Sequence, residues 1–269
     1  MTSPVHTSTD RAPLLFDYLL RLGDSPLILA QRLGEWIGKA PVLEEELANA
    51  NIGLDLLGQA RLWLAYAGEV EARYSSCPRD ADALAFTRDA GEFRNVLLVE
   101  RPNGNFADTL MRQFLFDTWH LRALQALSGS GDSRIADIAA KSVKEVTYHS
   151  ERSGDWIIRL GDGTEESHVR AQRALDALWT YSGEMFMNDA VDQAMLDAGC
   201  GVDLQALLDG WREHVGALLR EATLTLPPAD TYMQGAGGRG GKQGVHTEAL
   251  GHLLPEMQFL QRAYPGARW

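Results

Sequence analysis

Cysteine is scarce in this sequence, and its two cysteines form no motif. Cys77 and Cys200 are far apart in a chain of 269 residues. Such usage is typical of proteins from a reducing compartment, and it argues against a disulfide scaffold or a cysteine-based metal site.

Long apolar runs are absent as well. No uninterrupted apolar stretch approaches the roughly 20 residues that a membrane-spanning helix requires. The first residues, MTSPVHTSTDRAPL, are polar and lack the apolar core of a secretory signal. We therefore expect a soluble, cytoplasmic protein.

Basic residues are few relative to acidic ones. Lys and Arg number 25 and Asp and Glu number 37, which gives a formal net charge of −12. Such an acidic surface argues against binding to nucleic acid or to an anionic membrane. The hydrophobic share of 45% and the charged share of 23% are ordinary for a globular protein that can bury a sizeable core.

Strand-like alternation and hairpin signals are missing, whereas apolar residues recur at helical spacing. The spacing predicts long helices over about 13–37, 42–71, 106–128 and 133–160. The first contains Asp24-Ser25-Pro26, so it is either one kinked helix or two in line. The long connection before residue 106, with a short helix over about 83–88, predicts an all-α four-helix bundle with one long crossover.

The remainder of the chain also has a helical pattern. Helices are expected over about 165–187, 188–198, 203–222 and 246–264. We interpret 1–269 as a single domain, with a core bundle at about 13–160 and a C-terminal helical extension at about 164–269. The glycine-rich stretch 235–244 lacks P-loop spacing and follows no strand, so we expect a flexible loop or a partner contact there.

Four-helix bundles often hold a di-iron centre, so polar residues in mid-helix positions matter. Such sites use a Glu from each of two helices and a Glu-x-x-His motif from each of the other two. Residues three or four apart share one helix face, so their side chains can reach the same metal. The candidates, one pair for each bundle helix, are Gln31 and Glu35, Asp55 and Gln59, Asp117 and His120, and Glu145 and His149.

The candidate set departs from the di-iron pattern in its spacing. Gly58 stands three residues after Asp55, and Tyr148 stands three residues after Glu145, so His149 comes one position late. A spacing of four can still bind metal, as in HExxH proteases. Basic residues that could neutralise inward acids in place of iron are Arg32, Arg61, Arg112, Lys141 and Lys144. The same polar residues also suit ordinary hydrogen-bonded pairs, which buried polar groups require with or without a metal.

Several long strings carry a resemblance to a known family: LILAQRLGEWIGKAP, ANIGLDLLGQARLWL, FRNVLLVERPNGNFADTLMRQFLFDTWH, KEVTYHSERSGDWIIRLGDGTEES and HLLPEMQFLQRAYPGARW. From about Leu14 to Trp269 the chain resembles the structural C subunits of bacterial ring-1,2-phenylacetyl-CoA epoxidases. The resemblance implies a ferritin-like fold and a complex that epoxidises the aromatic ring of phenylacetyl-CoA with O₂. It also implies a paralogous A subunit that carries the di-iron centre and the substrate, and a flavin and iron–sulfur reductase that uses NADPH.

The resemblance further implies that this chain is structural and supports the A subunit, with no catalytic residue, cofactor or metal of its own. On that interpretation the eight candidate residues form a vestigial polar cluster. We also expect that the isolated chain can form a homodimer. Two alternatives stay open: a self-sufficient di-iron oxygenase that uses Asp117, His120, Glu145 and His149, and a binding module for CoA esters.

Overall fold

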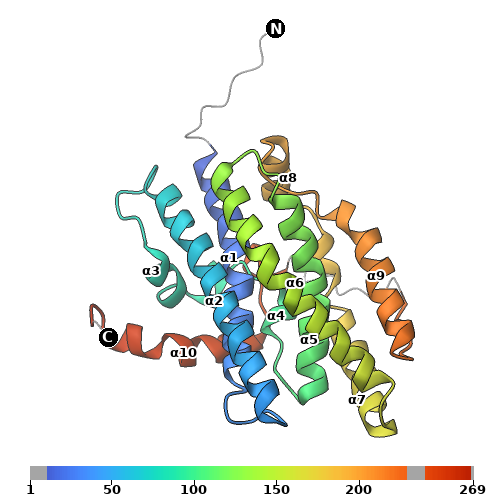
Figure 1. Cartoon of the computed structure of the whole chain (residues 1–269). Helices are drawn as coiled ribbons and strands as arrows, with labels where there is room; N and C mark the ends of the chain where they lie inside the picture. Colours follow the sequence, from blue (N-terminus) through green and yellow to red (C-terminus); the bar gives the residue numbers. More distant parts are fainter. Residues whose placement is uncertain (1–10, 229–239, 268–269) are drawn as a thin grey trace.

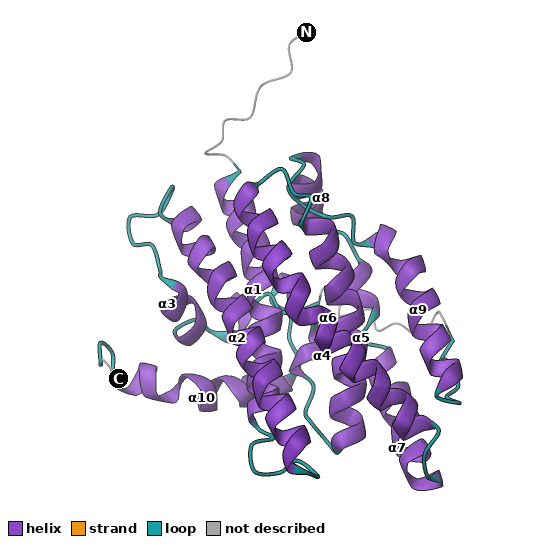
Figure 2. Cartoon of the chain, viewed as in Figure 1, coloured by secondary structure: helices purple, strands orange, loops and turns teal. Residues whose placement is uncertain are grey.

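The computed structural model of this protein describes residues 11–228 and 240–267, and its long helices form a bundle. The bundle helices lie side by side (Figure 1): α1 (Ala12–Gly34), α2 (Leu43–Glu71), α5 (Phe106–Leu127) and α6 (Ser133–Gly161). The part of the chain that the structure describes contains helices and loops and no strand (Figure 2). The expected all-α, ferritin-like fold class is confirmed.

The connection between α2 and α5 is long, as the sequence predicts. It contains α3 (Ala81–Phe86), the 3₁₀ turn η1 (Ala90–Glu92) and α4 (Leu97–Glu100). α3 begins two residues before the expected start because Asp80 caps it, its carboxylate accepting a hydrogen bond of 2.8 Å from the Ala83 N–H. This long crossover, and not a short hairpin, connects α2 to α5.

The first helix is continuous through Pro26, so the alternative of two helices in line is wrong. Tertiary contacts hold the residues before the proline. The buried Asp24 carboxylate pairs with Arg88 and accepts a hydrogen bond from the Arg94 N–H, and the Ser25 hydroxyl accepts one from the Val96 N–H. These bonds stabilise a segment in which proline removes one helical hydrogen bond.

The C-terminal half consists of shorter helices and 3₁₀ turns packed around the bundle, which we call the C-terminal layer. Its elements are α7 (Glu165–Trp179), η2 (Gly183–Phe186), α8 (Ala190–Asp197), η3 (Gln205–Leu207), α9 (Leu208–Glu221), η5 (Gly241–Gln243) and α10 (Glu248–Ala263). The expected helix over 165–187 is wrong beyond Trp179. The chain turns there because the buried Glu184 carboxylate accepts hydrogen bonds from the Leu97 N–H at 2.7 Å and the Lys242 N–H at 3.1 Å.

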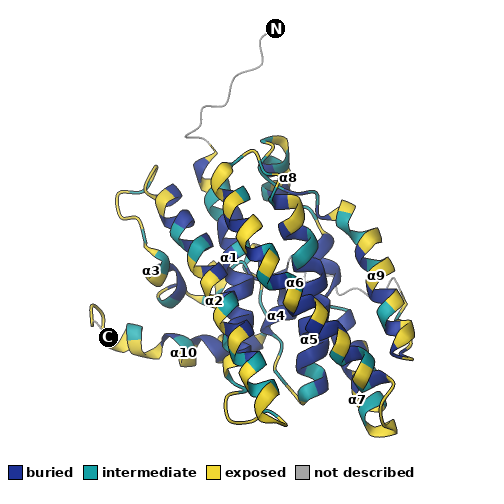
Figure 3. Cartoon of the chain, in the orientation of Figure 1, coloured by how far each residue is buried: buried dark blue, intermediate teal, exposed yellow. Residues whose placement is uncertain are grey.

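The buried residues lie mainly where the helices face one another (Figure 3), and large apolar side chains make up much of this core. Trp63, Trp179 and Trp211 are almost fully buried, and Trp211 donates its indole N–H to the Thr118 hydroxyl at 2.9 Å. Burial of a large apolar side chain contributes about 1.5–3 kcal/mol, so this core dominates the stability of the bundle. Among the described helices, none combines the length and apolar character needed to cross a bilayer.

Candidate functional site

Six of the eight sequence-predicted residues form a group between α2, α5 and α6, which we call the central cluster. Its members are Asp55, Gln59, Asp117, His120, Glu145 and His149. The side chains of α2 and α6 meet directly. His149 Nε2 lies 3.0 Å from Asp55 Oδ2, and Gln59 Nε2 donates to Glu145 Oε2 at 2.9 Å. In both helices the inward pair is four residues apart, so one face of each helix supplies both side chains.

Asp117 is the most deeply buried acid of the central cluster. Its carboxyl accepts hydrogen bonds from Gln113 Nε2 at 3.0 Å and from the Ser153 hydroxyl at 3.1 Å. Burial raises the pKa of Asp117 to about 8, although these bonds and the nearby Arg152 oppose the rise. The carboxyl is therefore mostly protonated at neutral pH.

The two histidines of the central cluster are neutral for the same reason. Burial lowers the pKa of His120 to about 3, and the neighbouring His149 lowers it further. Burial also lowers the pKa of His149, although Asp55 opposes this shift. The His120 ring packs against Phe116, with ring centroids 4.9 Å apart. At neutral pH Asp117, His120 and His149 thus carry little formal charge.

Gln31 and Glu35, from the first helix, do not join the other six through any contact that the structure shows. Because α1 ends at Gly34, Glu35 lies just beyond its last turn. There it forms an ion pair of 2.7 Å with Arg32 and accepts a hydrogen bond of 2.9 Å from Asn103. Gln31 is half-buried in that last turn, where its carbonyl accepts the Glu35 N–H. The prediction that all four bundle helices contribute to one cluster is therefore wrong for α1.

The interpretation of Gly58 and Tyr148 as lost ligand positions also changes. Gly58 is exposed, and Tyr148 is 51% exposed, so both face away from the central cluster. The buried His149 takes the inward place on α6. The register of α2 and α6 therefore places the fourth residue inward, where the di-iron pattern would place the third.

The basic residues also differ from expectation. Arg61, Lys141 and Lys144 are exposed, whereas Arg32 and Arg112 are buried. Arg32 donates to the backbone carbonyls of Glu100 and Ala249. Arg112 donates to the Arg101 carbonyl and to Asn103 Oδ1. The buried base beside the central cluster is Arg152, which was not among the predicted residues. It pairs with Glu45 and donates to Asn49 Oδ1 at 3.1 Å.

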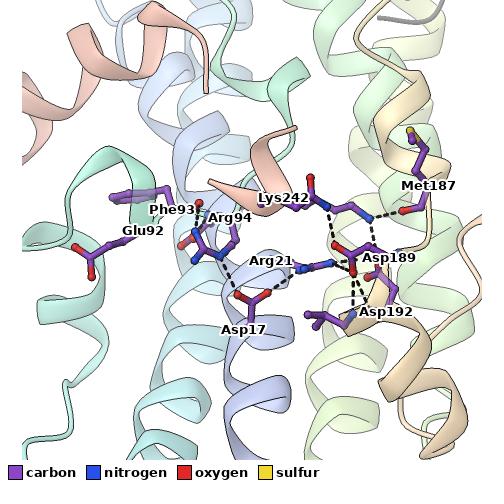
Figure 4. A network of polar contacts seen from close by, with 12 residues as sticks. Asp17, Arg21, Glu92, Phe93, Arg94, Met187, Asp189, Asp192 and Lys242 are labelled. Carbon is purple, nitrogen blue, oxygen red and sulfur yellow. Dashed lines mark hydrogen bonds and ion pairs between the residues drawn. The ribbon is translucent and has the colours of Figure 1, made fainter. Parts of the chain in front are cut away.

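A second polar site, which was not predicted from the sequence, joins α1 to the C-terminal layer (Figure 4). We call it the Arg21 network, and its members are Asp17, Arg21, Arg94, Asp189, Asp192 and Lys242. Arg21 contacts Asp17 at 2.9 Å, Asp189 at 2.8 Å and Asp192 at 3.1 Å. Lys242 lies 2.7 Å from Asp192, and Arg94 lies 2.8 Å from Asp17. Three bases and three acids therefore balance one another.

The charges of the Arg21 network are stabilised by these contacts. Burial opposes ionisation of Asp189, but hydrogen bonds from Arg21 and Gln243 outweigh it and lower the pKa of this carboxyl. Burial likewise opposes the charged form of Arg21, yet its acidic neighbours raise the pKa of the guanidinium. Contacts thus favour the charged forms of Asp189 and Arg21, whereas burial favours the neutral forms of Asp117, His120 and His149.

Lys242 also corrects the interpretation of the glycine-rich stretch. Residues 235–239 lie outside the described residues, but 240–242 are buried, so this part is not a flexible loop. A Cβ atom on Gly241 would lie 1.9 Å from the Asn95 carbonyl oxygen, and one on Gly240 would lie 2.3 Å from Glu184 Oε1. The glycines allow the close approach that delivers the Lys242 ammonium to Asp192.

Comparison with known proteins gives the context of these sites. The family model described as phenylacetic acid catabolic protein matches residues 2–269. The chain belongs to this family. Within it, the chain is 49% identical over 252 residues to the C subunit of the 1,2-phenylacetyl-CoA epoxidase of Escherichia coli (strain K12), a match that covers 94% of this chain and 98% of that protein.

The ferritin-like fold class of this family member raises the question whether the central cluster suits a metal pair. Its donor set does not. The Asp117 carboxyl accepts hydrogen bonds from Gln113 and Ser153, and His149 Nε2 and Glu145 Oε2 face Asp55 and Gln59. Across residues 11–228 and 240–267, no group of three or more His, Cys, Asp or Glu side chains is placed to hold a metal ion.

Proposed function

We propose that this chain is the structural subunit of a multicomponent phenylacetyl-CoA 1,2-epoxidase and acts in the cytoplasm. In this role it pairs with and supports a paralogous di-iron A subunit, which binds phenylacetyl-CoA and epoxidises its aromatic ring with O₂ and electrons from an NADPH-dependent reductase. The proposal depends on the 49% identity to the C subunit of the E. coli epoxidase across nearly the whole of both chains.

The geometry of the central cluster supports the non-catalytic part of the proposal. A metal-binding bundle needs ionised carboxylates and imidazole nitrogens that point at a shared centre. Here side chains of α2 and α6 pair with one another, at 3.0 Å for His149 with Asp55 and 2.9 Å for Gln59 with Glu145. This pairing satisfies the cluster only in part, because Gln59 Oε1, His120 Nδ1 and His149 Nδ1 are buried without a hydrogen-bond partner among the described residues.

Association with the catalytic subunit is the direct test. The chain is co-expressed with an affinity-tagged A subunit from the same organism, and the complex is isolated and assayed with reductase, NADPH and phenylacetyl-CoA. We expect stoichiometric co-purification, and epoxidation that requires the A subunit. A chain that fails to co-purify, or an A subunit that is equally soluble and active alone, would contradict the proposal.

Metal analysis separates the structural role from the self-sufficient oxygenase. The isolated chain, prepared from iron-supplemented cells, is expected to hold far less than one iron per chain and to consume no O₂ with the reductase. If it instead contained near-stoichiometric iron that His149→Ala abolished, the oxygenase alternative would replace the structural role.

A further inference from the structure

A groove at the protein surface lies between α5, α6 and α9, and we call it the α9 groove. Its volume is about 400 Å³, within the range of about 300–1,000 Å³ that is usual for small-molecule sites. The lining includes the buried Thr118, Ser150 and Gly154 and the half-buried Leu121 and Leu218. The groove is thus large enough for a small ligand and partly apolar.

Charged side chains of opposite sign line the α9 groove without pairing with one another. Arg122 comes from α5, and Glu151 and Asp155 come from α6. Among the described residues none forms an ion pair or hydrogen bond with these three side chains, and Arg122 Nε is buried without an acceptor. The groove between η1 and α10 differs, because its charged residues Asp89 and Arg262 pair with each other at 2.8 Å. The α9 groove therefore offers unpaired charges of both signs.

The register of α5 against α6 separates these charges along the groove. The two helices lie side by side and run antiparallel because a short connection joins them, and Ser153 Oγ donates to Asp117 Oδ2 at 3.1 Å. Arg122 comes five residues after Asp117 and is therefore level with the residue five positions before Ser153. With a rise of about 1.5 Å per residue, Asp155 lies roughly 10 Å further along α6. Glu151 lies between the two levels.

Apolar and neutral side chains occupy the stretch between the charges. Leu121 precedes Arg122, and Leu218 lies 3.5 Å from the place of a Cβ atom on Gly154, near the acidic end. The His214 imidazole also lines the groove, and burial and the nearby Arg122 lower its pKa, so it is neutral at pH 7. Among the described lining residues, this leaves Arg122 as the cation.

We propose that the α9 groove binds a small zwitterion, with a carboxylate at one end of a short carbon chain and an ammonium at the other. The Arg122 guanidinium fits the carboxylate, because its planar fork of N–H donors matches two carboxylate oxygens. The carboxylates of Glu151 and Asp155 fit the ammonium, and Leu121 and Leu218 fit the carbon chain. The ligand thus pairs both signs of charge at once. This site is independent of the structural role proposed above.

Isothermal titration calorimetry of the purified full-length chain with ε-aminocaproate tests the proposal. We expect saturable binding with a Kd of about 1 mM or below. Caproate and hexylamine each carry a single charge, and glycine is too short to span the groove. Each of these three should therefore bind at least about tenfold more weakly than ε-aminocaproate.

Substitutions at the two ends of the groove test the named residues. Arg122→Gln, and the double variant Glu151→Gln with Asp155→Asn, should each raise the Kd for ε-aminocaproate at least about tenfold. The helical circular dichroism should not change, because these side chains have no partner among the described residues. Lys141→Gln and Asp137→Asn change exposed positions of α6 outside the groove, so these matched controls should leave binding intact.

Three results would overturn the proposal. The first is no heat of binding up to about 10 mM ε-aminocaproate. The second is caproate or hexylamine that binds as tightly as the zwitterion, since one charge would then suffice. The third is a Kd that the groove variants leave unchanged.

Discussion

The central cluster and the Arg21 network both bury acids, but in opposite charge states. In the central cluster the most deeply buried acid, Asp117, has only neutral direct donors, Gln113 and Ser153, and burial raises its pKa to about 8. In the Arg21 network Asp189 lies 2.8 Å from Arg21, and although burial opposes its ionisation, hydrogen bonds from Arg21 and Gln243 lower its pKa. The comparison teaches that the available partners decide whether a buried acid keeps its charge.

The two sites also differ in the parts of the chain that they join. The central cluster connects residues within the bundle, whereas Lys242 and Asp192 connect the C-terminal layer to α1. A buried ion pair adds little net stability over an apolar contact, but loss of one partner leaves an uncompensated charge. The Arg21 network therefore fixes the place of residues 240–242 more than it adds stability.

Removal of the Lys242 charge should have the largest effect on the free energy of unfolding. Lys242→Met leaves Asp189 and Asp192 with one fewer cation in a buried site, so we expect the free energy of unfolding to fall by about 3 kcal/mol. Urea denaturation measures this. The double variant Lys242→Met with Asp192→Asn should lose less than the sum of the single variants. If Lys242→Met lowers the free energy of unfolding by less than about 1 kcal/mol, the buried charges of the Arg21 network depend on their partners no more than the central cluster does.

The charge state of Asp117 should appear as a pH dependence of intermediate size. Its folded-state pKa, about 8, lies above its ordinary value of 3.8, so its contribution to stability is complete at low pH and is lost as pH rises toward 8. Between pH 6.5 and 8 the stability of the wild type should fall relative to Asp117→Asn, by up to about 1.4 kcal/mol per pH unit.

The measurements start at pH 6.5 because below that pH the titration of His120 changes the free energy of unfolding in the opposite direction. Its folded-state pKa, about 3, lies below its ordinary value of 6.5, so its contribution is complete above 6.5 and is lost as pH falls. Urea denaturation at several pH values gives the free energy of unfolding of the wild type and of Asp117→Asn as a function of pH. A wild type and an Asp117→Asn variant with parallel curves above pH 6.5 would mean that Asp117 is ionised like the acids of the Arg21 network.

The smallest effect is expected at the edge of the central cluster. The Asp55 side chain is 39% exposed, so its contact with His149 is screened by water and Asp55→Ala should cost less than about 1 kcal/mol. Thermal and urea unfolding check this value. A loss above about 2 kcal/mol would show that this pair holds the bundle together as firmly as the buried pairs of the Arg21 network.

Helical periodicity explains most of what the sequence predicted. The helices at 42–71, 106–128 and 133–160 agree with α2, α5 and α6 to within about a residue because their apolar positions recur at one face. The same periodicity placed Asp55, Gln59, Asp117, His120, Glu145 and His149 at the centre of the bundle. Periodicity could not decide whether the residue three or four positions after an inward acid also points inward, since both lie near the same helix face.

The failures concern contacts between distant segments. Glu35 was grouped with the central cluster because the end of α1 could not be located from its apolar pattern. Lys242 was assigned to a loop because glycine content alone suggests flexibility, whereas a glycine also permits close approach of two backbones. The run Gly240-Gly241-Lys242 was a usable signal, but its partners Asp192 and Glu184 lie about 50 or more residues away in sequence.

The sequence by itself determined that this protein is an all-α bundle, which helices build it, and to which family its strings point. Periodic burial of apolar side chains is a local property, and long shared strings are directly readable. Only the tertiary structure decided that α1 continues through Pro26, that α7 ends at Trp179, and that Lys242 enters a buried charge network. Each of these depends on a hydrogen bond or ion pair with a distant residue, and such pairing is fixed by packing rather than by spacing along the chain.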